Sequence, residues 1–236
     1  MFFKKNKEKT KNSFARHLIT VKDPKAVVSE QFKTIRTNIN FSMPDEDLKT
    51  LVITSSTPGE GKSTNSSNIA VVFAQSGKKV LLIDSDMRKP TAHHTFNVSN
   101  TRGLSNVLTR QFSYEDVVHE TLVEGLSLIT SGPIPPNPVE LIASQTMERL
   151  IEKVSEDFDI VIFDAPPVLS VTDAQILANK LDGTILVVHS GKAEKDNVVK
   201  AKEVLVASKA NMLGVVLNYY KLEKDHYYYQ YYGTQE

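Results

Sequence analysis

The sequence predicts an α/β fold, with helices on both faces of a doubly wound, mostly parallel sheet. Strand-like and helix-like segments alternate from residue 50 onward, and several predicted strands are apolar at consecutive positions, as in Val80-Leu81-Leu82-Ile83. Such strands are buried on both faces, as happens when helices cover a parallel sheet. A glycine-rich loop and acidic residues follow three of the strands, so their side chains should meet at the carboxyl edge of the sheet, where such folds bind ligands.

The element boundaries follow from apolar periodicity and from residues that start helices. Asp23 and Pro24 mark the start of the first helix, as its cap and as a first-turn residue. Strands are predicted at 50–55, 79–84, 126–130, 159–164, 184–189 and 212–218. Helices are predicted at 24–41, 62–76, 138–155, 172–181 and 195–208, with short helices at 104–109 and 113–119 and a rigid proline-rich loop at 131–138.

Composition narrows the classes of protein to which this chain can belong. Its 236 residues are enough for one α/β domain, and 40% hydrophobic and 24% charged residues are typical of a soluble globular protein. A formal net charge of zero gives no bulk attraction to nucleic acid, and the absence of cysteine excludes disulfides and thiolate chemistry. Because the sequence has no apolar run of about 20 residues and no signal peptide, a cytoplasmic location is expected.

Two segments of unusual composition flank the predicted domain, which covers residues 22–218. Residues 1–21 carry six basic residues against one acidic residue, which predicts a mobile segment. This segment is either simply solvated or drawn to an anionic membrane surface. Residues 219–236 hold seven of the eight tyrosines with no hydrophobic periodicity, which predicts a flexible tail.

The strongest motif is Ser56–Thr64, Ser-Thr-Pro-Gly-Glu-Gly-Lys-Ser-Thr, between a predicted strand and a predicted helix. Its glycines let the backbone approach an anion, and the N–H groups at the helix start would face phosphates. Lys62 would reach the β- and γ-phosphates of a nucleotide, and the Ser63 hydroxyl would bind Mg²⁺. The standard pattern has glycine where this chain has Ser56. The predicted nucleotide-binding residues are Pro58, Gly59, Glu60, Gly61, Lys62, Ser63 and Thr64.

Acidic residues end two of the apolar strands, at the same edge of the sheet as this loop. Asp84, Asp86 and Arg88 follow one strand, and Asp164 closes the other. Asp164 has the position at which P-loop enzymes hold Mg²⁺, whereas Asp84 and Asp86 could accept the proton of an attacking hydroxyl or complete the metal shell. Arg88 could neutralise phosphate charge. The competing interpretation is that these aspartates only form turns or cap helices.

The tail supplies candidate acceptors for a phosphoryl group. A phenol on an exposed tail can be brought in line with a γ-phosphate, and each added phosphate would bring nearly two negative charges. The alternative is an aromatic tail that packs on a partner. The candidate acceptors are Tyr227, Tyr228, Tyr229, Tyr231 and Tyr232, hereafter the C-terminal tyrosine cluster, with Tyr219, Tyr220 and Tyr114 as alternatives.

Together these motifs resemble those of the bacterial tyrosine kinases (BY-kinases) of capsule and exopolysaccharide synthesis, in their cytoplasmic Gram-positive form. Ser56–Thr64 matches the family's Walker A form, Val80–Arg88 its second Walker motif, and Ile160–Asp164 its Walker B strand. The C-terminal tyrosine cluster matches the family's autophosphorylation tail. The resemblance covers the chain from about residue 20 onward. It implies a P-loop NTPase fold of the deviant-Walker type, which partition ATPases share.

The resemblance implies an ATP-dependent autokinase that phosphorylates the tyrosine cluster of a neighbouring copy. By the motif match, Lys62 and Ser63 bind ATP and Mg²⁺, and Asp86 and Asp164 support the metal. Asp84 is then the favoured base for the tyrosine hydroxyl. The division of roles between Asp84 and Asp86 stays open.

Two further matches concern the last strand and the first helix. Asn218 resembles the residue that reads adenine in related ATPases. The segment that includes Glu30, Lys33 and Arg36 resembles a Glu-x-x-Arg-x-x-Arg motif that builds a ring of subunits, with lysine in place of the first arginine. Lysine keeps the charge but loses the bidentate fork, so a ring with a weaker contact is expected. A helix face that is merely solvated is the alternative.

The resemblance also implies partners: a membrane-embedded activator that recruits the kinase to the inner face of the membrane, protein tyrosine substrates, and a cognate tyrosine phosphatase. Two rival functions remain, a partition- or septum-type switch ATPase and a non-catalytic ATP-binding regulator of polysaccharide machinery. The switch ATPases carry an extra lysine near the start of the phosphate loop, where this chain has Ser55-Ser56-Thr57-Pro58. The intact catalytic motifs argue against the regulator.

Overall fold

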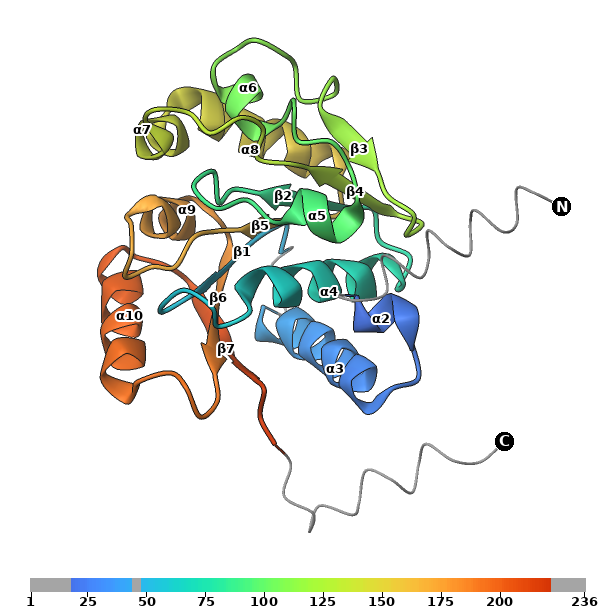
Figure 1. The fold of residues 1–236 in the computed structure, drawn as a ribbon, viewed down its shortest axis with the longest axis vertical. Helices are drawn as coiled ribbons and strands as arrows, with labels where there is room; N and C mark the ends of the chain where they lie inside the picture. Colours follow the sequence, from blue (N-terminus) through green and yellow to red (C-terminus); the bar gives the residue numbers. More distant parts are fainter. Residues whose placement is uncertain (1–17, 44–47, 222–236) are drawn as a thin grey trace, which may run out of the picture.

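The computed structural model describes residues 18–43 and 48–221, which form a seven-stranded sheet covered by helices on both faces (Figure 1). The strand order is β3-β4-β2-β5-β1-β6-β7, and neighbours pair in parallel except β3 with β4. This topology confirms the predicted doubly wound α/β fold. The strands are β1 (Thr50–Ser55), β2 (Val80–Asp84), β3 (Val118–Glu120), β4 (Leu126–Ile129), β5 (Ile160–Asp164), β6 (Gly183–His189) and β7 (Met212–Asn218).

The helices divide between the two faces of the sheet, and each face has its own apolar core. One face carries α2 (Ile19–Lys22), α3 (Val27–Ser42), α4 (Lys62–Ala74) and α5 (Ala92–Phe96). The other carries α6 (Leu104–Leu108), α7 (Pro138–Ala143), α8 (Gln145–Asp157), α9 (Asp173–Lys180) and α10 (Lys195–Ala207). The central strands β1, β2 and β5 are buried at every position, because their alternate side chains enter the two cores.

The register of the central strands brings the acidic residues together. Asp84 at the end of β2 lies opposite Asp164 at the end of β5, and Asp164 also lies opposite Ile53 of β1. The phosphate loop leaves β1 two residues later, so the loop and both carboxylates share the carboxyl edge, as the sequence predicts.

Two predicted helices near the β3 end of the sheet are wrong in extent or type. The helix predicted at 138–155 is broken at Ser144, whose backbone is extended. The Ser144 side chain accepts a hydrogen bond from the N–H of Met147, in the first turn of α8. The helix predicted at 113–119 is a single turn, after which Val118 pairs with β4 in the antiparallel strand β3. In the second case, pairing with a sheet edge outweighs local helix propensity.

The N-terminal region also differs from the expectation. Within the predicted mobile segment, residues 18–21 pack on the domain, with Leu18 and Thr20 only 1% exposed. The first long helix, α3, begins at Val27 without a side-chain cap, so neither Asp23 nor Pro24 starts it. Residues 1–17 and the C-terminal tyrosine cluster lie outside the described residues. Within the described ranges, no helix combines the length and the apolar character needed to cross a membrane.

Candidate active site

The phosphate loop between β1 and α4 depends on two glycines with left-handed backbones. Gly59 has φ of 84° and Gly61 has φ of 90°, a region that side chains disfavour. A Cβ at Gly61 would lie 2.1 Å from the Asn218 side-chain nitrogen, so only glycine fits beside the last strand. Pro58 is exposed on this loop, and Thr64 is exposed in the first turn of α4. The loop therefore leaves its backbone open to a ligand where a Cβ would obstruct it.

The side chain of Glu60 holds the loop from within. Its carboxylate is 2% exposed and accepts the N–H groups of Ser56 at 2.8 Å and Thr57 at 3.1 Å. The Ser56 hydroxyl donates to the same carboxylate at 2.8 Å. This contact explains the serine at a position where the standard motif has glycine. Since the carboxylate of Glu60 is used inside the loop, only its main chain is available to the predicted nucleotide.

The Lys62 ammonium group lies between two carboxylates at the end of the loop. Its Nζ atom is 2.9 Å from Asp86 Oδ2 and 3.5 Å from Asp164 Oδ1, and it donates to Ser63 Oγ at 3.2 Å. Burial lowers the pKa of Lys62, but Asp164 and Asp86 outweigh this effect and raise the pKa above its usual value. Lys62 therefore stays charged, and the four predicted site residues form one cluster.

Asp164 and Asp84 are buried carboxylates side by side. Ser66, one helical turn after Lys62, donates its hydroxyl to Asp164 at 3.2 Å. Burial raises the pKa of Asp164, and burial together with the charge of Asp164 raises the pKa of Asp84 to about 7. The pair thus concentrates negative charge at a place where a cation would relieve it.

Asp84 also shapes the loop that follows β2. Its Oδ2 atom accepts the N–H groups of Thr91 and Ala92, both at 3.0 Å, and its Oδ1 atom accepts the N–H of Asp86 at 3.3 Å. A carboxylate offers about four acceptor positions, so Oδ1 retains one. Asp86, in turn, accepts the N–H of Lys89 at 3.0 Å and points its other oxygen at Lys62.

Arg88 is engaged by a residue that the sequence analysis did not single out. Its Nε atom donates to Asp173 Oδ2 at 3.1 Å, and its Nη2 atom donates to Oδ1 at 3.2 Å. Asp173 is fully buried at the start of α9, so this bidentate pair ties the β2–α5 loop to α9. Arg88 therefore neutralises the Asp173 carboxylate in this structure, and its guanidinium group is not free to face the phosphate loop.

Asn218 connects the last strand to the phosphate loop. Its Nδ2 atom donates to the main-chain oxygen of Glu60 at 2.9 Å, and its Oδ1 atom accepts the N–H of Tyr219 at 3.1 Å. The Tyr219 ring stacks on His189 at the end of β6, with centroids 4.4 Å apart. Sequence reasoning missed His189 because its role depends on a contact between neighbouring strands.

The chain is similar to known proteins in both sequence and structure. A family model described as an AAA domain matches residues 48–196. Tyrosine-protein kinase YwqD of Bacillus subtilis (strain 168) is 52% identical over 221 residues, which cover 94% of this chain and 93% of YwqD. The chain belongs to the bacterial tyrosine-protein kinase family.

Other similar proteins have the same family name. Tyrosine-protein kinase CpsD of Streptococcus agalactiae serotype III is 43% identical to this kinase over 80% of this chain and 81% of CpsD. Among solved structures, the chimerical protein CapA2B2 is 46% identical, with a TM-score of 0.85 over 87% of this chain and 91% of its own. The kinase domain of Escherichia coli ETK is 33% identical, with a TM-score of 0.77 over 84% and 79% of the two chains. Family membership implies the use of ATP.

The fold of the kinase is also found in more distant solved structures. The septum site-determining protein MinD of Pyrococcus horikoshii, complexed with Mg-ADP, is 23% identical with a TM-score of 0.64 over 75% of this chain and 72% of its own.

Tyr114, an alternative acceptor, is 8% exposed in the kinase and donates its hydroxyl to Asp157. Burial first, and then the hydrogen bond to Asp157, raise the pKa of Tyr114. This phenol is therefore a structural group.

The predicted ring residues of the kinase lie on α3. Glu30 and Lys33 form an ion pair of 2.7 Å on the helix surface. Arg36 instead donates from Nη1 to the main-chain oxygen of Val72 in α4 at 2.7 Å. The three residues therefore divide into an exposed pair and an arginine that binds the neighbouring helix.

Proposed function

We propose that this kinase transfers the γ-phosphoryl group of ATP to tyrosines in the C-terminal cluster of a neighbouring copy. We further propose that this autophosphorylation regulates capsular or exopolysaccharide synthesis and export. The observation that carries the proposal is the Lys62 ammonium between Asp86 and Asp164, at the end of a glycine loop that Glu60 holds in shape. Charge at this place is what phosphoryl transfer requires, because its catalysis is mainly positioning and electrostatic stabilisation.

The residues present fit a nucleotide with Mg²⁺. Gly59 and Gly61 leave the loop backbone accessible. The Lys62 ammonium group would move from Asp86 and Asp164 to the phosphates. The Ser63 hydroxyl and the carboxylates of Asp86 and Asp164 would hold Mg²⁺, which prefers oxygen ligands and binds through one or two carboxylates plus substrate phosphates. When bound, Mg²⁺ would neutralise charge that develops on the transferred group.

Asp84 is the proposed base for the acceptor phenol. Its Oδ1 atom retains an acceptor position, and the backbone donors around it fix its orientation. In the reaction the phenol oxygen forms a bond to the γ-phosphorus, the bond from that phosphorus to the β-bridging oxygen breaks, and the phenol proton passes to Asp84. ADP is then the leaving product. Arg88 holds the β2–α5 loop, which carries Asp86, in place through its bidentate contact with Asp173.

The adenine and the partners complete the proposal. Asn218 would read the adenine base, since it lies against the phosphate loop at the end of β7. Glu30, Lys33 and Arg36 would form the contact between subunits of a ring. A membrane-embedded activator would supply a cytoplasmic segment and recruit the kinase to the membrane, and the similarity to the CapA2B2 chimera supports a partner of this kind. A cognate tyrosine phosphatase would reverse the modification.

The test is labelling of purified full-length protein with ATP and Mg²⁺ in the presence of the activator's cytoplasmic segment, followed by phosphotyrosine detection. Replacing the five tyrosines of the C-terminal cluster by phenylalanine should remove the label and leave ATP binding unchanged. Mixing a Lys62→Met copy with a copy that lacks the cluster tyrosines should restore label on the first, because transfer occurs between copies. Hydrolysis without phosphotyrosine would support a switch ATPase instead, and neither product would support a non-catalytic regulator.

A further inference from the structure

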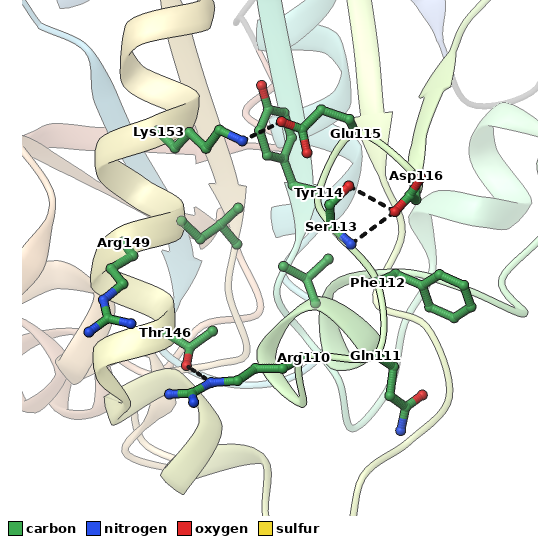
Figure 2. A pocket seen from close by; sticks show the side chains of 12 residues that line it. Arg110, Gln111, Phe112, Ser113, Tyr114, Glu115, Asp116, Thr146, Arg149 and Lys153 are labelled. Atoms are coloured by element: carbon green, nitrogen blue, oxygen red, sulfur yellow. Dashed lines mark hydrogen bonds and ion pairs between the residues drawn. The ribbon is translucent and has the colours of Figure 1, made fainter.

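A cavity lies at the β3 end of the sheet, away from the phosphate loop. It has a volume of about 440 Å³, and its walls are the segment from α6 to β3 and the outer side of α8 (Figure 2). Three cationic side chains line it, Arg110, Arg149 and Lys153. Two acidic side chains, Glu115 and Asp116, line it as well, together with the apolar Val107 and Leu150. We name this cavity the arginine pocket, and no step of the proposed reaction uses it.

The two ends of the arginine pocket differ in their charge balance. At one end Lys153 forms an ion pair with Glu115 and lies over the Tyr114 ring, 4.9 Å from its centroid. At the other end Arg110 donates only to the neutral hydroxyl of Thr146, at 3.3 Å. The side chain of Arg149 makes no hydrogen bond or ion pair with any residue that the structure describes. Two guanidinium groups at one end of the cavity are therefore without a counter-ion from the described chain (Figure 2).

The end of α6 places Arg110 at the edge of the pocket. The N–H of Arg110 binds the oxygen of Val107 and the N–H of Gln111 binds the oxygen of Asn106, both at 2.9 Å, which closes α6 with a Schellman motif. Arg110 has φ of 60° and occupies the position that glycine usually takes, as Lys209 does after α10. From this position its guanidinium extends toward α8 and donates to Thr146.

We propose that the arginine pocket binds phosphotyrosine from the C-terminal cluster of a second copy of the chain. The two guanidinium groups supply planar, bidentate donors for a phosphate dianion, which is the common way in which proteins read phosphorylated residues. Val107 and Leu150, 8% and 5% exposed, supply an apolar contact for the ring. This proposal rests on the proposed function, because the proposed reaction produces the ligand.

The length of the chain favours a second copy over the same copy. The sheet order places β3 six strand spacings from β7, or about 29 Å away. Tyr227 follows Lys221 by six residues and can lie at most about 21 Å from it, so it cannot reach the pocket of its own chain. Tyr228 and Tyr229 fall short by the same arithmetic, and only Tyr231 and Tyr232, at most about 35 and 39 Å from Lys221, could span this distance. A neighbouring copy imposes no such limit.

Binding of a synthetic phosphopeptide tests the pocket without depending on catalysis. The probe is a fluorescein-labelled peptide of residues 222–236 phosphorylated at Tyr228, titrated with full-length protein that carries Lys62→Met and phenylalanine at the five cluster tyrosines. This protein can neither modify the probe nor supply a competing phosphate. Fluorescence polarisation should show that the phosphorylated peptide binds. The affinity of the unphosphorylated peptide should be at least about tenfold lower, because it lacks the charge-assisted hydrogen bonds of the phosphate.

Variants of the pocket decide where the peptide binds. Arg110→Ala with Arg149→Ala should weaken binding at least about tenfold, and the double lysine variant should weaken it less, because charge remains but the fork is lost. Lys200→Ala with Lys202→Ala, which removes the same charge from the exposed surface of α10, should leave binding unchanged. Circular dichroism and thermal melting of each variant check that the fold is intact.

Three results would overturn the proposal. Equal binding to the protein with and without Arg110 and Arg149 would remove the pocket as the site. An equal loss of peptide affinity in the α10 control would show that the effect comes from the net charge of the protein rather than from the pocket. A phosphoserine peptide that binds as tightly would remove the assignment to phosphotyrosine. The labelling test above is separate: phosphorylated tails with no pocket binding refute only the pocket, whereas peptide binding without autophosphorylation refutes only the autokinase.

Discussion

The two ionic regions of the molecule differ in how their charges are balanced. At the phosphate loop, Lys62 lies between two carboxylates of which Asp86 is 4% exposed and Asp164 is 1% exposed. At the β3 end, Arg110 and Arg149 are exposed on the rim of a cavity, and neither has an anionic partner among the residues that the structure describes. The described chain thus supplies a cation to the carboxylates of the first region but pairs no anion with the two guanidinium groups of the second.

This difference separates chemistry from recognition. Buried, paired groups have few alternative positions, and their electrostatic effect is strong because water is excluded. Exposed guanidinium groups are screened by salt and exchange partners readily, which suits a contact that phosphorylation switches on and off. Variants in the first region should therefore change rates, and variants in the second should change binding between copies.

The largest effect is expected for Lys62→Met. The γ-phosphate would lose its cation, and two buried carboxylates would lose their counter-ion. Phosphotyrosine labelling should fall by about 10³-fold or more, the range seen when a transition-state cation is removed. Lys200→Met, on the exposed surface of α10, is the matched control. Undiminished labelling of the Lys62 variant would refute the site.

Asp84→Asn should have the next largest effect. Loss of a general base lowers turnover by about 10²- to 10⁴-fold, whereas the amide oxygen can still accept the N–H groups of Thr91 and Ala92. Single-turnover labelling should therefore show a slower step with little change in ATP affinity, measured by titration with a fluorescent ATP analogue. If Asp84→Asn keeps its rate while Asp86→Asn loses it, Asp86 is the base and Asp84 only shapes the loop.

Glu60→Ala should weaken ATP binding by about tenfold and lower stability. The variant leaves the buried N–H groups of Ser56 and Thr57 without their acceptor, and each such group costs about 1–3 kcal/mol. Glu60→Gln should retain part of both effects. Ser56→Gly removes only the hydroxyl contact and should change ATP affinity the least. Isothermal titration calorimetry and urea denaturation measure the two quantities, and normal affinity in Glu60→Ala would show that the loop does not need this support.

The smallest effect on stability is expected for Glu30→Ala with Lys33→Ala. An exposed ion pair contributes only about 0–1 kcal/mol, so the fold should be almost unchanged. The mass measured by light scattering should fall, because a weak contact between subunits is removed. Arg36 stays in place in this variant, since its loss would also break the bond to Val72. Unchanged mass would exclude the exposed side of α3 as the ring contact.

The sequence predicts most of the fold because the signals are local. Consecutive apolar residues identify the buried strands, and the glycine loop identifies the carboxyl edge. The errors lie where tertiary contacts decide: β3 forms because Val118 meets the edge of β4, and the helix from residue 138 breaks because Ser144 caps a second helix. The packing of residues 18–21 on the domain likewise depends on contacts that the sequence does not display.

The candidate site is predictable in its membership but less so in the direction of its side chains. The structure brings Lys62, Ser63, Asp86 and Asp164 together as the motif spacing indicates. Ser66 could also have been found, since it lies one helical turn after Lys62 on the same side of α4. The partnership of Arg88 with Asp173 joins residues 85 positions apart and has no signal in the sequence.

The inward carboxylate of Glu60 has a consequence for the catalytic cycle. Every turnover passes through an interval in which product has departed and fresh substrate has not arrived. A loop that was ordered only by a bound nucleotide would lose its conformation during that interval. This loop instead keeps its conformation, because the Glu60 carboxylate binds its N–H groups from within. Each incoming nucleotide therefore meets the same loop conformation. The entropic cost of ordering the loop is met once, on folding, rather than in each round of binding.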